Sequence, residues 1–226
     1  MTSPPATTTS SLAANWIGRL WRRLEARLRP APIATAETLR TFLEERAALI
    51  AQKCAIDYCR GKTGLASYAL FTEKPFLDAL DVCRWETFVV VLGDLLIVAE
   101  GHLRPHVPAE QHPRLFEALF ALYSAVLAAL PAPAHRAHGW SDATESFTSR
   151  LRRVSLGEPQ QALDVADHSA KRLFETLPIH ISMRKLDEEP VYGSVRFRMI
   201  AVSQEMERRL RAADLVGRLL AAQYVT

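Results

Sequence analysis

The stretch FVVVLGDLLIVA, residues 88–99, is the longest apolar run of the chain. At the period of an α-helix its apolar side chains fall on every face instead of along one stripe, which is the pattern of a helix surrounded by protein. The run is shorter than the roughly 20 residues that a membrane-spanning helix needs, and Asp94 lies near its middle. We therefore expect a long buried helix, from about Thr72 to Leu103, to be the central element of the fold.

The composition around this run is that of a helical globular protein. Of 226 residues, 49% are hydrophobic and 23% are charged, only nine are glycine, and Ala, Leu, Arg and Glu are abundant. A chain of this length can bury an ample core without disulfides or bound metal. We predict an all-α fold, a multi-helix bundle of about seven helices with an N-terminal amphipathic helical arm.

Helical periodicity and the positions of proline and glycine divide the chain into these helices. Prolines and a glycine make residues 131–140 (PAPAHRAHGW) a linker-like break within a single domain, residues 35–226. Residues 195–199 alternate as in a strand, but apolar residues continue at steps of four and three as far as Leu220 and favour one final helix of about 28 residues. Residues 178–194 have a mixed pattern without a predicted helix. The predicted helices cover about residues 15–30, 35–60, 72–103, 114–130, 141–156, 159–177 and 195–222.

Residues 15–30, NWIGRLWRRLEARLRP, combine five arginines and one glutamate with two tryptophans. At 100° per residue they form a helix with an apolar face about 100° wide and arginines on the opposite side. Residues 1–11 are small and polar and are expected to be a flexible tail. The residues that we expect to dock on another surface are Trp16, Ile17, Arg19, Leu20, Trp21, Arg22, Arg23, Leu24, Arg27 and Leu28.

The positive charge of the chain is concentrated in this arm. Residues 1–34 hold five arginines and one glutamate, a net charge of +4, which leaves 23 of the 28 basic and 24 of the 25 acidic side chains for residues 35–226, a net charge of −1. Nucleic-acid binding depends on clustered basic residues, so the neutral body argues against a nucleic-acid partner. We expect the partner to be a protein complex or an anionic membrane surface, near which each basic residue adds about 1 kcal/mol.

Three roles for the arm stay open. It fits docking on a membrane or partner, docking on a groove of its own domain, and an organellar targeting peptide, because Ser, Thr and Arg abound and acids are scarce before Glu25. No apolar run of the secretory kind occurs near the N-terminus. We expect a cytoplasmic protein, with a peripheral position at the inner membrane if the arm docks there, or an organellar matrix protein if residues 1–34 are a targeting peptide. The high Ala, Arg and Leu content indicates a bacterial source.

Asp94 is the charge that the fold must accommodate, because its neighbours in the sequence are all apolar. A buried carboxylate has to be paired, hydrogen-bonded or protonated. We expect an ion pair with an arginine from another helix, Arg196 or Arg198, and the alternative is a catalytic acid or base.

Five of the seven histidines lie between residues 102 and 138. His102, His106 and His112 with Glu110 supply a ligand number acceptable for zinc. The spacing matches no metal motif such as HExxH, so histidines exposed at a proline-broken helix end are the favoured interpretation. We predict no metal site and no cofactor.

The cysteines and the paired aspartates also favour structural roles. Cys54, Cys59 and Cys83 are odd in number and lack metal-like spacing, so we expect free, buried thiols in a reducing compartment. Two DxxD pairs, Asp78/Asp81 and Asp164/Asp167, lie near predicted helix starts, where acidic residues suit the helix dipole.

The predicted function is that of a non-catalytic accessory, adaptor or assembly protein that docks on a membrane surface or a larger complex through its basic arm. The alternative is an all-α enzyme or apolar-ligand-binding protein with a site near Asp94 or in the His102–His112 loop. A ligand carrier should hold a closed apolar pocket beside Asp94, whereas an adaptor should have a solid core and an exposed apolar patch.

Overall fold

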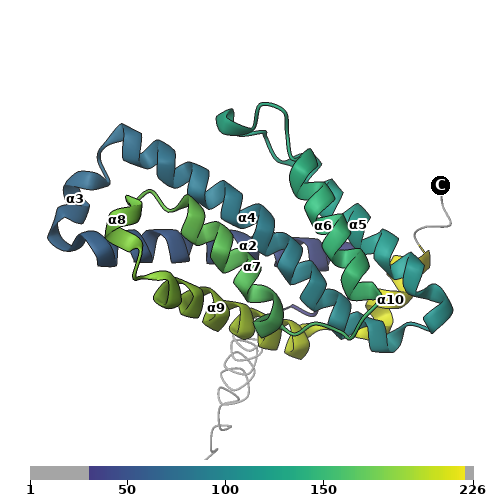
Figure 1. Ribbon diagram of the computed structural model, residues 1–226. Helices are drawn as coiled ribbons and strands as arrows, with labels where there is room; N and C mark the ends of the chain where they lie inside the picture. The colour runs from purple at the N-terminus through teal and green to yellow at the C-terminus, as the bar shows by residue number, and fades with distance from the viewer. Residues whose placement is uncertain (1–30, 222–226) are drawn as a thin grey trace, which may run out of the picture. The chain divides into compact units, whose positions relative to one another are not determined.

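The computed structural model describes residues 31–221, and this part of the chain is an all-α bundle, which confirms the predicted fold class (Figure 1). Four short 3-10 turns join the longer elements: η1 (Gly64–Ala66), η2 (Arg104–His106), η3 (Ala109–Gln111) and η4 (Ala134–Arg136). The α-helices are α2 (Ala36–Thr63), α3 (Ser67–Leu70), α4 (Lys74–Leu103), α5 (His112–Ala129), α6 (Ser141–Ser155), α7 (Ala162–Thr176), α8 (Ile181–Arg184), α9 (Glu188–Arg209) and α10 (Ala212–Ala221).

Local sequence signals fix both ends of α2. Thr35 is the N-cap, as predicted, and its hydroxyl accepts a hydrogen bond from the backbone N–H of Thr38 while the Thr38 hydroxyl accepts one from the backbone N–H of Thr35. The helix ends before Gly64, whose φ of 52° lies in the region that favours glycine.

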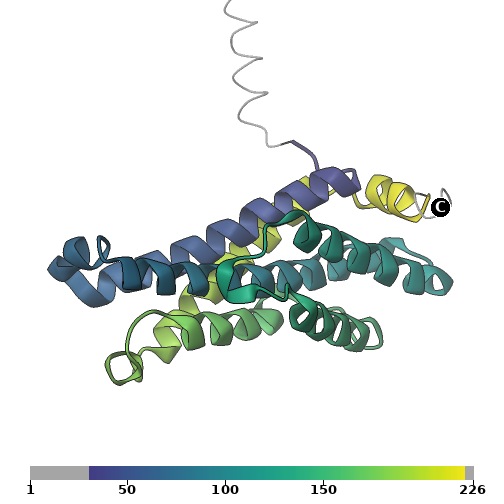
Figure 2. The ribbon, with the colours of Figure 1, turned by 90° about the horizontal axis from the view of Figure 1, so that it is seen from above.

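Helix α4 is the centre of the fold, as the apolar run predicted. Every residue from Val91 to Glu100 is buried, and α4 packs along both α2 and α7, between which it lies in Figure 2. Helix α9 packs on α7 and α2 and completes a four-helix core, while α5, α6 and α10 pack around the C-terminal half of α4. No helix within residues 31–221 is long and apolar enough to cross a membrane.

The prediction of one final helix is wrong at its start and in its continuity. Helix α9 begins at Glu188, within the segment that had no predicted helix, and it is interrupted at Leu210, where the backbone is extended, before α10 resumes. The interruption arises because Ile33 competes for the helical backbone: its N–H donates to the carbonyl of Arg209 and its carbonyl accepts from the N–H of Arg211, both at 2.9 Å. The apolar stripe continues across the break, so periodicity alone does not reveal it.

The segment 131–140 is a loop, as predicted, but it is packed on the bundle. Trp140 is 7% exposed, and Arg136 binds Glu86 on α4. Residues from Ile33 onward form one compact unit. The arm, with all ten of its predicted docking residues, lies outside the described residues, so the proposed boundary between arm and domain stays a prediction.

The three cysteines are free and buried, which confirms their expected structural role. Burial raises the pKa of the Cys59 thiol to about 12 and, against weaker opposing hydrogen bonds, that of the Cys83 thiol to about 11. Both thiols are therefore protonated at neutral pH and are poor nucleophiles.

We predict that Leu95→Ala, at a fully buried position of α4, lowers the free energy of unfolding by about 2–5 kcal/mol, because the cavity adds to the lost transfer free energy. The matched change Leu156→Ala, at a side chain that is 86% exposed, should cost less than about 0.5 kcal/mol. Urea denaturation of both variants measures the difference, and equal effects would contradict the central role of α4.

Candidate functional site

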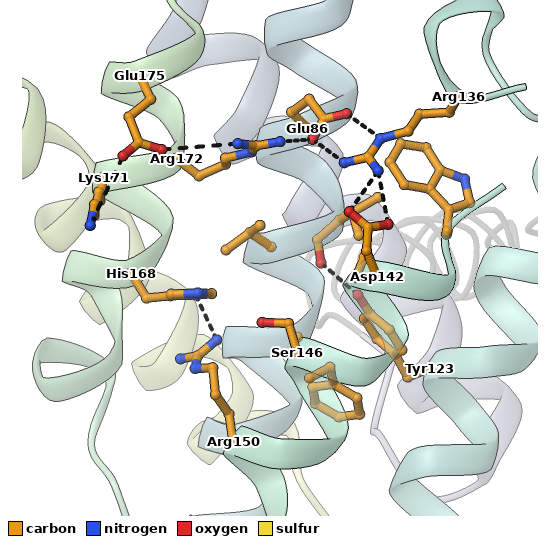
Figure 3. A pocket seen from close by; sticks show the side chains of 16 residues that line it. Glu86, Tyr123, Arg136, Asp142, Ser146, Arg150, His168, Lys171, Arg172 and Glu175 are labelled. Atoms are coloured by element: carbon orange, nitrogen blue, oxygen red, sulfur yellow. Dashed lines mark hydrogen bonds and ion pairs between the residues drawn. The ribbon is translucent and has the colours of Figure 1, made fainter. Parts of the chain in front are cut away.

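A cleft of about 340 Å³ lies between α6 and α7, with α4 as its floor (Figure 3). The loop before α6 contributes Arg136 and Trp140 to one end. The cleft is open to solvent and rich in charged side chains. An apolar-ligand carrier would need a closed apolar pocket beside Asp94. The described residues form an open, charged cleft there instead.

Asp94 lies directly behind this cleft and is 0% exposed. Its Oδ1 forms an ion pair with Nη1 of Arg150 at 2.5 Å. Its Oδ2 accepts hydrogen bonds from the backbone N–H of Ser169, at 3.1 Å, and from the Ser169 hydroxyl. Ion pairing and hydrogen bonding both offset the cost of burying a carboxylate, and Asp94 has an ion pair at Oδ1 and hydrogen bonds at Oδ2.

The prediction that Asp94 pairs with an arginine from another helix is confirmed, but the two arginines that it named are wrong. Arg196 forms an ion pair with Asp167 at 2.6 Å, and Arg198 with Asp57 at 3.0 Å. Both arginines belong to α9, whereas Asp94 faces α6 and α7. Arg150 reaches it from α6, a pairing that no local spacing in the sequence could indicate.

Arg150 also fixes the protonation of His168. Its Nη1 lies 2.6 Å from His168 Nδ1, which is also 3.3 Å from Asp94 Oδ1; because a guanidinium can only donate, Nδ1 of a neutral imidazole accepts from Arg150. We assign the ring proton to Nε2 from this hydrogen bond. Nε2–H is then a donor at the wall of the cleft, and Nε and Nη2 of Arg150 make no hydrogen bond with other described residues. Two side chains thus offer unused donors at one place.

Glu86 organises the opposite end of the cleft. This carboxylate is 4% exposed, and it accepts hydrogen bonds from Arg136, with Nε at 2.6 Å, and from Arg172, while Nε2 of His135 lies 3.0 Å away. Burial raises the pKa of Glu86, but the hydrogen bonds and charges of Arg136 and Arg172 outweigh it and lower the pKa to about 2. Glu86 is therefore a permanent anion that aligns two arginines.

One face of α7 lines the cleft with His168, Lys171, Arg172 and Glu175 (Figure 3). These residues are spaced three and four apart, which places them on one side of a helix. Lys171 is 68% exposed in its side chain and lies 4.0 Å from Glu175, and Nη1 of Arg172 lies 3.9 Å from the same carboxylate. Glu175 is thus a loose counter-ion for both.

The floor between the two charged ends is apolar. Val89, Val90 and Gly93 of α4 face the cleft, and Phe147 of α6 stacks on Tyr123 with ring centroids 4.2 Å apart. A Cβ atom at position 93 would lie 3.1 Å from the Phe147 ring. Glycine is therefore what lets the Phe147 ring approach α4 this closely.

The candidate histidine loop does not assemble into a site. His102 lies 3.2 Å from the hydroxyl of Ser203, and His112 lies 3.2 Å from the carbonyl of Val107. Burial lowers the pKa of His102, against a smaller opposing effect of Glu207. Within residues 31–221, which include His106 and Glu110, no group of His, Cys, Asp and Glu is arranged to hold a metal ion.

The paired aspartates have local roles. Asp164 accepts the backbone N–H of Gln161 in a capping box at the start of α7, and Asp167 binds Arg196. Asp78 binds Lys74 at 2.7 Å, one turn earlier on α4. These contacts agree with the structural interpretation of both DxxD pairs.

No family model matches the chain, and neither a curated protein nor a solved structure is detectably similar to it.

Sequence reasoning found Asp94 but missed the cations around it. Arg136 lies in the predicted linker, and nothing in the local sequence distinguishes Arg150 and Arg172 from other arginines of the predicted helices at residues 141–156 and 159–177. A readable signal did exist in α7, where His168, Lys171 and Arg172 share one helical face with few apolar residues. The pairing of that face with α6 follows only from the fold.

We predict that Glu86→Gln destabilises the protein most at neutral pH. The folded-state pKa of about 2 lies below the ordinary value of 4.5, so ionised Glu86 contributes stability that is fully present above pH 4.5 and is lost as the pH falls toward 2. The difference in unfolding free energy between wild type and variant, measured by urea denaturation from pH 7 to pH 3, should shrink as the pH falls. A constant difference would show that ionisation of Glu86 has no part in it.

Proposed function

We propose that this protein binds a small organic anion in the cleft between α6 and α7. The observation that carries the proposal is the unused donor set at Arg150 and His168, held in place by the buried carboxylate of Asp94. Preorganised donors that have no partner among the described residues favour a ligand with acceptor oxygens, such as a carboxylate or phosphate. A cleft of about 340 Å³ suits a molecule of metabolite size.

The arrangement supports binding better than proton transfer. A general base needs a free nitrogen lone pair directed at the substrate, and Nδ1 of His168 is occupied by Arg150. The other nitrogen carries the proton, so His168 can donate a hydrogen bond to a bound oxygen. The contact with Arg150 that makes His168 a donor toward a bound anion therefore leaves this side chain without a free lone pair for the role of base.

Ser146 allows a test that leaves the buried ion pairs intact. It lies exposed on α6 and lines the cleft, so Ser146→Asp places a carboxylate beside the proposed anion. We expect isothermal titration with butyrate and with inorganic phosphate to show binding to wild type that the variant weakens about tenfold, since each 1.4 kcal/mol of repulsion is tenfold in affinity. Ser149→Asp is the matched control, because Ser149 is exposed on the same helix outside the cleft. Absence of anion binding to wild type would refute the proposal.

A second candidate is the docking role predicted from the arm. The end of the bundle that holds α3 and α8 favours this role (Figure 1). An ion pair of 2.6 Å between Lys62, at the end of α2, and Asp187, just before α9, links the two segments. Large apolar side chains are exposed on both of them. Scattered exposed apolar residues need no explanation, but a cluster indicates an interaction surface. These residues are Leu65 and Tyr68 near α3 and Ile181, Met183 and Leu186 near α8.

An anionic membrane is the partner that the charge of the arm favours, since residues 1–34 carry a net charge of +4. We predict that the full chain co-sediments with vesicles containing phosphatidylglycerol but not with phosphatidylcholine vesicles. Exchange of Arg19, Arg22 and Arg23 for Glu should abolish sedimentation, and Leu65→Asp with Leu186→Asp should weaken it. Leu156→Asp, at another exposed leucine, is the control. Protein that stays in the supernatant with both vesicle types would exclude this role.

A further inference from the structure

We infer that the ligand of the cleft is a short aliphatic dicarboxylate, bound with its carboxylates at the two cationic ends of the α7 face. This inference rests on the proposed function and specifies its ligand. It follows from three features: two separate anchors, their spacing along α7, and the apolar surface between them.

The first anchor is the pair Arg150 and His168. Arg150 presents Nε and Nη2, which are adjacent on one edge of the planar guanidinium, and such an edge matches the two oxygens of a carboxylate. The Nε2–H of His168 adds a third donor at the same end. Asp94 holds this anchor in place without contacting these donors, because its own oxygens face Nη1 of Arg150, Nδ1 of His168 and Ser169.

The second anchor is the pair Lys171 and Arg172. Nη2 of Arg172 is fixed by Glu86. Among residues 31–221, its Nη1 has only Glu175, at 3.9 Å, and Lys171 has only the same carboxylate, at 4.0 Å. Both separations exceed hydrogen-bond distance. A ligand carboxylate that made direct hydrogen bonds would therefore replace Glu175 as the counter-ion of both cations.

The spacing of the anchors sets the length of the ligand. His168 and Arg172 are four residues apart on α7, which corresponds to a rise of about 6 Å. Val89 and Val90 line the cleft from α4, so the atoms between the two carboxylates meet an apolar surface. Methylene groups suit such a surface, and a chain of about four to six carbons in all spans this rise. A monocarboxylate would satisfy one anchor only.

Glu175 and Lys171 provide variants that separate the two anchors, because neither makes a contact that the fold depends on: both are partly exposed and lie 4.0 Å apart. Isothermal titration of the full chain would compare glutarate with butyrate, which has one carboxylate fewer, for wild type and for each variant. We expect wild type to bind glutarate at least about tenfold more tightly than butyrate. Lys171→Gln should remove most of that preference.

Glu175→Gln gives the opposite expectation, since it removes the competing carboxylate. Glutarate affinity should rise several-fold, and butyrate affinity should stay the same. If wild type binds butyrate and glutarate equally, or if Lys171→Gln and Glu175→Gln leave the preference for glutarate unchanged, the second anchor is refuted while the proposed anion site stands. If neither anion nor inorganic phosphate binds, the proposed function fails together with this inference.

Discussion

The ion pair between Asp94 and Arg150 is the interaction on which the rest of the site depends. A carboxylate in the middle of the most buried helix has to be neutralised from outside that helix, and Arg150 supplies the charge from α6. The pairing ties α6 to α4, while the hydrogen bonds from Ser169 tie α7 to the same carboxylate. One buried charge thus positions both walls of the cleft and the guanidinium of Arg150, which lines it.

Glu86 repeats this arrangement two turns earlier on α4. It too is buried, and it gathers Arg136 from the loop before α6 and Arg172 from α7. The two carboxylates of α4 therefore hold cations at both ends of the cleft, and the apolar residues between them separate the charges. The two buried carboxylates thus lie behind arginines that line the cleft, while Asp142 and Glu175, whose side chains are partly exposed, are the acids at its surface.

The sequence was sufficient to predict the fold class because its signals are local. The apolar run of residues 88–99, the Thr35 cap and Gly64 mark helices whose ends are fixed within a few residues of the signal. The break at Leu210 was missed because its cause, Ile33, is remote in the sequence. The site was missed for the same reason. Asp94 is conspicuous among apolar neighbours, but its partner is 56 positions away, and an arginine on an amphipathic helix looks the same whether it meets water or a buried carboxylate.

The absence of a side chain at Gly93 has a consequence for how this architecture can diverge. The Phe147 ring would lie 3.1 Å from a Cβ atom there, so even a single methyl group would act as a wedge between α4 and α6. The width of the cleft between α6 and α7 therefore depends on one position whose residue makes no polar side-chain contact. Gly93, which has no charge of its own although it adjoins Asp94, can thereby decide how wide a molecule is admitted.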